Sequence, residues 1–131
     1  MLKLIKNWLQ DKAVYIAVII TVTIIFLSLL NPSSIPTPSI HVSDKTMHTF
    51  AYFSLMLSWK FVFNNRRELK YSIIIFFLLF LFGIVLELLQ ASLTMYRTAD
   101  WRDVIANTIG LLMGLLMYTT LYKTIFKTEK I

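Results

Sequence analysis

The chain has no cysteine and few of the residues that mark loops and soluble surfaces. Without cysteine it can form no disulfide, no thiolate metal site and no thiol nucleophile. The absence of cysteine also gives no indication of whether the protein works in an oxidising or a reducing compartment. Only three glycines and three prolines occur in 131 residues, and all the prolines lie between residues 31 and 43. Charged residues make up 15% of the chain, against roughly a quarter in soluble domains. This composition excludes an ordinary soluble domain.

Long apolar runs dominate the sequence instead. Hydrophobic residues make up 57% of the chain, and several runs approach the length of about 20 residues that a helix needs to cross a bilayer. We expect one all-α membrane domain over residues 1–131, with four transmembrane helices in a compact bundle. The second expected span is the least hydrophobic. The four spans are residues 13–30, 46–63, 71–89 and 103–122.

A short basic segment, residues 1–12, precedes the first span and contains Trp8. This pattern is typical of an amphipathic segment at a membrane interface. A basic start before an apolar run is also typical of a secretory signal, but the residues after the run, Asn31-Pro-Ser-Ser, lack a small-x-small cleavage pattern. An uncleaved span is therefore favoured. The Pro- and Ser-rich stretch 31–43 is expected to be an outer linker, outside the hydrocarbon core.

Lysine and arginine are concentrated in alternate connecting segments, and this predicts the orientation. The N-terminal segment has three, the second loop with its flanks has four, and the C-terminal tail has three. We therefore expect both termini in the cytoplasm of a bacterium and the protein in its cytoplasmic (inner) membrane. The basic residues that give the formal charge of +6 are then expected to hold the cytoplasmic side against anionic lipids, and no nucleic-acid partner is expected. Lys60, near the end of the second span, is expected to snorkel to the surface.

Ionisable residues occur inside or beside the last three spans. Such a residue costs a few kcal/mol unless it is paired or faces a wet cavity, so it marks a candidate site. At a rise of about 1.5 Å per residue, Glu87 lies about 25 Å beyond Lys70, near the outer surface. His48 begins the second span and Asp103 the fourth at that same surface, with Asp100 as the expected N-cap of the fourth helix. Three helices should thus bring polar side chains to one depth.

Within each of these helices the polar residues share a face, because residues three or four apart lie on the same side. We expect an outward-facing ligand pocket lined by Asp44, Lys45, His48, Tyr52, Glu87, Gln90, Arg97, Asp103 and Asn107. Close helix packing is expected at the small residues Gly83, Ala106, Gly110 and Gly114. A plainer explanation stays open for Glu87, which would fix helix register by pairing with Arg97 or His48. Asp103 would then be only a first-turn residue of its helix.

The same positions resemble the pattern of the VanZ-like family of small integral membrane proteins. The first block of the family, Asp-Lys-x-x-His-x-x-x-Tyr, is matched by Asp44, Lys45, His48 and Tyr52. The second block, Gly-x-x-x-Glu-x-x-Gln, then Arg, then Asp-x-x-x-Asn-x-x-Gly-x-x-x-Gly, is matched by Gly83, Glu87, Gln90, Arg97, Asp103, Asn107, Gly110 and Gly114. The family is linked to resistance to teicoplanin, a glycopeptide antibiotic with a lipid tail. The resemblance therefore implies a cell-envelope protein acting at the outer leaflet, without a defined reaction.

Two hypotheses for function follow from this pocket. In the first, a non-enzymatic protein binds a membrane lipid headgroup, a lipidated amphiphile or a cell-wall precursor, and Arg97 pairs with its anionic group. In the second, an intramembrane hydrolase or transferase acts on an envelope lipid, with His48 and Glu87 as acid and base and Asp103 orienting His48. A divalent metal on His48, Glu87 and Asp103 is an alternative, but one histidine with two carboxylates is a weak metal signature, so no cofactor or metal is expected. The sequence leaves open whether the chain is an enzyme and whether it oligomerises.

Overall fold

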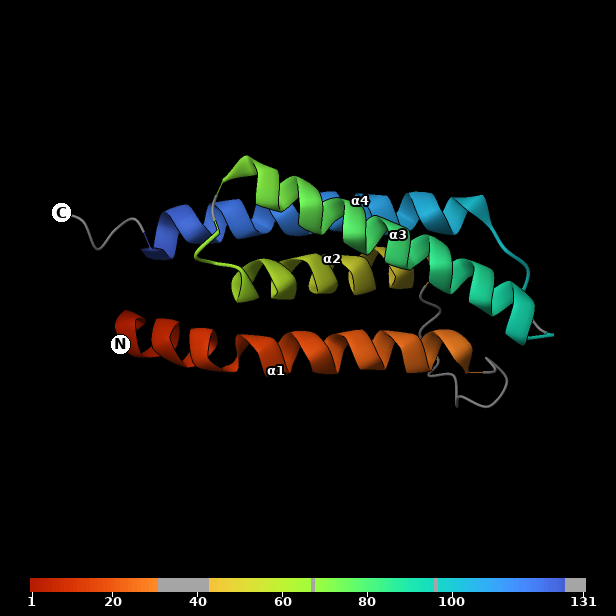
Figure 1. The fold of residues 1–131 in the computed structure, drawn as a ribbon, viewed down its shortest axis with the longest axis horizontal. Helices are drawn as coiled ribbons and strands as arrows, with labels where there is room; N and C mark the ends of the chain where they lie inside the picture. The colour runs from red at the N-terminus through yellow and green to blue at the C-terminus, as the bar shows by residue number, and fades with distance from the viewer. Residues whose placement is uncertain (31–42, 67, 96, 127–131) are drawn as a thin grey trace.

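Four long helices make up the described part of the chain in the computed structural model, which covers residues 1–30, 43–66, 68–95 and 97–126. They lie side by side along one long axis (Figure 1). The linker 31–42, Tyr96 and the tail 127–131 lie outside the described residues. The helices are α1, Leu2–Leu29; α2, Asp44–Val62; α3, Leu69–Leu93; and α4, Trp101–Leu121, which continues into a π-helical turn, η2, over Tyr122–Phe126.

The all-helical prediction is confirmed, and three of the four expected spans are helices long and apolar enough to cross a membrane. These three are Lys3–Leu29, Leu69–Leu93 and Trp101–Thr124, and they are typical of a multi-pass membrane protein. The helix that falls short is α2, because polar residues are interspersed along its 19 residues. Residues 1–12 do not form a separate segment. They are the first turns of α1, because no proline or glycine interrupts the helix.

The central helix, α2, contacts all three others and lies closest to α4. Two glycines of α4 explain this approach: a Cβ atom on Gly110 would overlap the backbone of Thr49, and one on Gly114 would lie 2.7 Å from the carbonyl oxygen of Phe53. The hydroxyl of Thr49 also donates across the contact to the carbonyl of Ala106, at 3.2 Å. Small residues at a helix interface let the two backbones touch. The pair of α2 and α4 is therefore the frame against which α1 and α3 pack.

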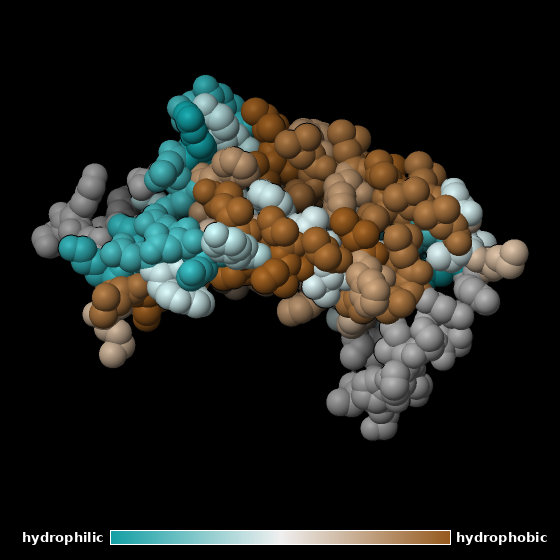
Figure 2. Space-filling view, turned by 60° about the horizontal axis from the view of Figure 1, so that its bottom comes forward, coloured by the Kyte–Doolittle hydropathy of each residue, from teal (hydrophilic) through white to brown (hydrophobic). Residues whose placement is uncertain are grey.

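The outside of the bundle is largely apolar. Figure 2 shows a broad hydrophobic surface along the middle of one face, with hydrophilic residues gathered mainly towards one end. Large apolar side chains on the outer faces include Phe26, Phe77 and Leu116, each more than half exposed. A continuous apolar exterior of this extent is typical of a surface that lipid covers. The core between the helices is built from Ile24, Tyr52, Leu55, Met56, Ile75, Leu86 and Leu111.

The two ends of the bundle carry opposite charge. The start of α1, the connection from α2 to α3 and the end of α4 lie at one end (Figure 1), which we call the basic end. Its basic side chains include Lys3, Lys6, Arg66, Lys70 and Lys123. The start of α2 and the connection from α3 to α4 lie at the other end, which we call the acidic end. It holds the acidic residues Asp44, Glu87, Asp100 and Asp103.

The prediction that Lys60 snorkels to the surface is wrong. Its side chain is enclosed between α2, α3 and α4, and the residue is 1% exposed. The ammonium donates to the hydroxyl of Ser72 at 2.8 Å and lies 4.8 Å from the ring centroid of Tyr118. Lys60 lies one turn beyond Met56 on the buried face of α2, so its stem points into the bundle rather than along its surface. The hydroxyl of Tyr118 in turn donates to Asn64 Oδ1 at 2.7 Å.

Candidate functional site

Lys45 ties the first turn of α2 to the start of α4 at the acidic end. Its ammonium lies 2.8 Å from Asp100 Oδ2 and also pairs with Asp103 Oδ1. Asp100 is the N-cap of α4, as the sequence predicts, and its Oδ1 accepts the backbone N–H of Arg102 at 2.9 Å. The pKa of Asp100 lies below its ordinary value, because Lys45 first, and then the Arg102 amide, favour the charged carboxylate. Charge-assisted hydrogen bonds therefore fix the register between the two helices.

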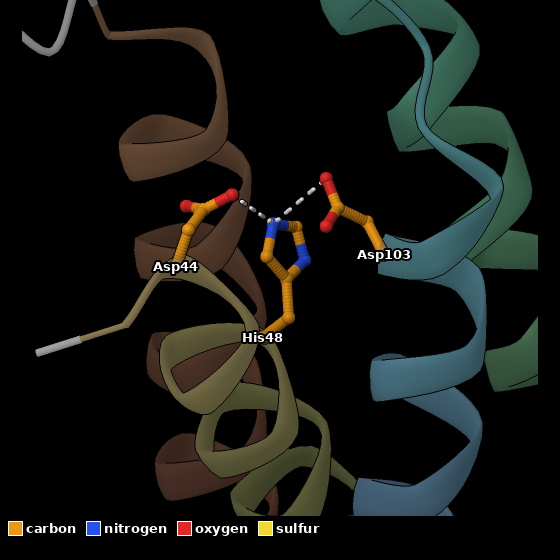
Figure 3. A group of neighbouring side chains, drawn as sticks. All are labelled: Asp44, His48 and Asp103. Atoms are coloured by element: carbon orange, nitrogen blue, oxygen red, sulfur yellow. Dashed lines mark ion pairs between the residues drawn. The ribbon is translucent and has the colours of Figure 1, made fainter.

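His48 lies one turn further along α2 and points towards α4, between Asp44 and Asp103 (Figure 3). Its Nδ1 is 3.0 Å from Asn107 Oδ1. Because an amide oxygen can only accept, Nδ1 carries the proton of this hydrogen bond. Its Nε2 faces two carboxylates, with Asp103 Oδ2 at 3.6 Å and Asp44 Oδ2 at 3.9 Å. One ring nitrogen of His48 is therefore hydrogen-bonded to α4, while the other faces carboxylates of α2 and α4.

Glu87 is buried near the end of α3, 5% exposed. Its Oε1 accepts the backbone N–H of Asp100 at 2.9 Å, so the carboxylate faces the positive end of α4. Among the described residues, no ion pair joins Glu87 to Arg97 or His48. The ion pair of Glu87 with Arg97 or His48, which the sequence left open, is therefore not formed in the described part of the chain, and Glu87 instead holds the backbone at the start of α4.

Gly83 gives Tyr52 and Asn107 the space that they occupy deeper in the bundle. A Cβ atom on Gly83 would lie 3.1 Å from Tyr52 Cε1 and 3.2 Å from Asn107 Nδ2. Both side chains are almost fully buried, each residue being 3% exposed. Asn107 is the partner of His48, so the close approach of α3 at Gly83 also supports the histidine.

Two adjoining recesses open at the acidic end. The polar recess has a volume of about 400 Å³, and the apolar recess, between α1, α2 and the end of α3, has a volume of about 200 Å³. Asp44, Gln90 and Arg97 line both, so the two recesses share a wall. The polar recess is completed by Glu87, Thr98, Asp100 and Asp103. The apolar recess is completed by Ile24, Leu27, Ser28, Met47, His48, Ala51 and Tyr52.

The structure brings all nine predicted pocket residues to the acidic end. Seven of them line a recess, while Lys45 and Asn107 lie behind the lining and contact Asp103 and His48. The sequence assigned Asp100 only to a helix cap, although it also lines the polar recess. It gave no sign of the α1 residues in the apolar recess, because Ile24 and Leu27 look like any lipid-facing residues. Gln90 is the link to that helix, since its Nε2 donates to the carbonyl of Ser28 at 2.9 Å.

One group of side chains here has the donor types of a metal site. Asp44, His48 and Asp103 each offer one ligand atom, and these atoms lie within 4.8 Å of one another. The set considered from the sequence contained Glu87 in place of Asp44. Glu87 is instead directed at the backbone of Asp100.

Comparison with known proteins identifies the family of the chain. A model of the VanZ/LLP1 family matches residues 12–123, which include every residue that lines the two recesses. The chain belongs to the VanZ/LLP1 family. The family resemblance seen in the sequence is thereby confirmed. The polar residues of the VanZ-like pattern are also those that the structure gathers at the acidic end, while its glycines lie deeper, at contacts between helices.

A relative of this VanZ/LLP1 chain occurs in the fission yeast Schizosaccharomyces pombe, where it is described as "Uncharacterized protein C11E3.10". The two are 33% identical over 95 residues, which cover 72% of this chain and 56% of the yeast protein. The chain thus spans about half the length of this curated relative. No solved structure matches the chain. Because the relative is fungal, similarity to it does not assign the VanZ/LLP1 chain to a bacterial envelope.

Proposed function

We propose that this VanZ/LLP1 protein binds the headgroup of a membrane lipid or lipidated amphiphile at its acidic end. All four helices would cross the membrane in this proposal, with α2 shielded by the other three. Both termini would be cytoplasmic, because basic residues gather at the end where α1 starts and α4 ends. In a bacterial cytoplasmic membrane, the acidic end would then face the outer leaflet.

The observation that carries this proposal is the pairing of a polar and an apolar recess around Arg97. An amphiphile has the same two parts, a polar head and an apolar chain. Arg97 borders both recesses and has no ion pair among the described residues, so its guanidinium is available to a phosphate or carboxylate. Phospholipids, lipid-linked cell-wall precursors and lipoglycopeptides such as teicoplanin all combine an acyl or prenyl chain with a polar head. The link between the family and resistance would follow if such a compound were held here.

The proposal is tested by measuring lipid binding to the purified full chain in detergent. We expect native mass spectrometry to show retained anionic phospholipid and thermal unfolding to shift upwards when that lipid is added. The Arg97→Ala variant should bind about tenfold more weakly, since a hydrogen bond to a charged group contributes about 1.5–3 kcal/mol. The matched control is Arg66→Ala, an exposed arginine at the basic end, which should bind as the unchanged protein does. No lipid-dependent shift, or equal loss in both variants, would refute the proposal.

An enzymatic alternative is favoured by the position of His48. Its Nδ1 is fixed by Asn107, so its Nε2 is directed at the carboxylate of Asp103, next to the polar recess. An intramembrane hydrolase or transferase acting on an envelope lipid would use His48 and Glu87 as acid and base, with Asp103 orienting the histidine. The chain should then convert a bound lipid to product, detected by mass spectrometry, and both His48→Gln and Glu87→Gln should abolish conversion. Binding without conversion would leave the non-enzymatic function.

A further inference from the structure

The three side chains Asp44, His48 and Asp103 converge at the acidic end (Figure 3), and each lines at least one of the two recesses. We infer that they bind a divalent transition-metal ion at the acidic end. Their ligand atoms lie within 4.8 Å of one another, and His48 Nε2 is 3.6 Å from Asp103 Oδ2 and 3.9 Å from Asp44 Oδ2. Ligands bound to one ion at about 2.0–2.2 Å are separated by up to about twice that length. Small rotations of the two aspartates therefore suffice to surround an ion.

The direction of the His48 ring is the first argument for a cation. Asn107 Oδ1 accepts from Nδ1, which leaves Nε2 with a lone pair when the imidazole is neutral. This lone pair faces the oxygens of two carboxylates, which are also acceptors. Three acceptors that converge repel one another unless a positive charge lies between them. A metal ion supplies that charge, and the hydrogen bond from Nδ1–H to Asn107 is the outer contact that orients most metal-binding histidines.

The balance of charge is the second argument. Asp44, Glu87, Asp100 and Asp103 line the polar recess against one guanidinium, that of Arg97. Lys45 contributes a second positive charge through Asp100 and Asp103. Arg102, beside Asp100, contributes a third. The four carboxylates still outnumber the three cations, so the recess attracts a positive ion. Lys45 does not block the site, because its ammonium pairs with Oδ1 of Asp103, whereas Oδ2 of Asp103 faces His48.

The donor set indicates which ions fit. One imidazole nitrogen and two carboxylate oxygens suit Mn²⁺ and Zn²⁺, whereas a site for Mg²⁺ or Ca²⁺ is usually built from oxygen alone. The ion would also explain how an anionic headgroup enters a recess rich in carboxylates, because the headgroup would contact the metal as well as Arg97. In this last step the inference rests on the proposed function. The metal site itself does not need a lipid.

The inference is tested on the purified full chain, stripped with a chelator, by titration with MnCl₂ and with ZnCl₂ in the calorimeter. We expect one ion per chain. Asp103→Asn and His48→Gln should each bind at least tenfold more weakly, while Glu87→Gln and Asp100→Asn should stay within about threefold of the unchanged protein. The last two remove carboxylates of the same recess, so they separate a defined site from general attraction to acidic residues. Equal weakening by all four substitutions would overturn the inference.

A second measurement needs no variant and so does not depend on whether a variant folds. Electron spin echo modulation of the Mn²⁺-loaded protein should show coupling to the ¹⁴N nucleus of one imidazole, which His48 alone would supply at this site. Absence of that coupling, or no binding of either ion, would overturn the inference. The metal titrations are made in lipid-free detergent solution, so metal binding is measured separately from lipid binding. A chain that binds Mn²⁺ but no lipid contradicts only the proposed function, and one that binds lipid but no ion contradicts only the metal site.

Discussion

Two polar clusters lie in this bundle, one partly exposed and one buried, and they differ in what surrounds them. At the acidic end, carboxylates, Lys45, His48 and Arg97 converge on two recesses. Towards the basic end, Lys60 is more deeply buried than any of these, and its ammonium meets a hydroxyl and an aromatic ring. Among the described residues no carboxylate pairs with Lys60, and none of the recesses described above is lined by it.

The difference shows that a buried charge in a membrane protein is not by itself evidence of a site. Lys60 is held by Ser72 from α3 and Tyr118 from α4, so its charge links three helices and faces no open space. The acidic end uses some of its charges in the same way, as the bridge from Lys45 to Asp100 shows. It also leaves Arg97 facing a hollow. Charge directed into a recess, rather than charge that is merely buried, separates the candidate site from the structural cluster.

The largest effect is expected where both clusters depend on the same contact. Gly110→Val should prevent α2 and α4 from touching, because any Cβ atom there overlaps the backbone of Thr49 and a backbone shifts less easily than a side chain. We expect a loss of about 3 kcal/mol or more, seen as a collapse of the thermal unfolding midpoint in detergent. Gly83→Ala is the control, since its Cβ atom meets only side chains, at 3.1 and 3.2 Å. Equal stability of the two variants would contradict the tight α2–α4 frame.

An intermediate effect on stability is expected when the buried cluster around Lys60 is altered alone. Lys60→Ala should lower the free energy of unfolding by about 2–4 kcal/mol, because it leaves a cavity between three helices. Lys60→Met keeps the volume of the stem and removes the buried charge, so it should cost less than about 1.5 kcal/mol. Lipid and metal binding should be unchanged in both variants. Loss of binding in Lys60→Met, measured as above, would show that the two clusters are not independent.

The smallest effect concerns pH at the acidic end. The pKa of Asp100 is lower in the folded chain than its ordinary value, because of Lys45 and the Arg102 amide. A carboxylate of this kind stabilises the fold above its unfolded pKa of about 4 and loses that contribution as pH falls through the lower, folded pKa. The thermal midpoint should therefore fall more steeply below pH 4 in the unchanged protein than in Lys45→Gln. Identical acid slopes would show that the exposed pair of Lys45 and Asp100 contributes nothing measurable.

The sequence predicts the site better than it predicts the walls around it. The depth of Glu87 and the helical positions of His48 and Asp103 follow from helix geometry, because rise and rotation per residue are fixed. The orientation of Lys60 does not follow, since it depends on where α3 and α4 pack against α2. The apolar recess also does not follow from the sequence. Its walls on α1 are ordinary aliphatic residues, and only the tertiary packing of α1 against α2 and α3 makes them concave.

The position of α2 has a consequence for how the protein is made. The helix least able to enter lipid alone is the one that contacts all the others, and its closest partner, α4, is the last of the four to be synthesised. Until α4 is present, the face of α2 that carries Lys45, His48 and Thr49 has no protein to cover it. Stable insertion of α2 should therefore wait for α4. A ribosome-bound intermediate that ends before residue 101 should hold α1 and α3 in the membrane more firmly than the helix between them.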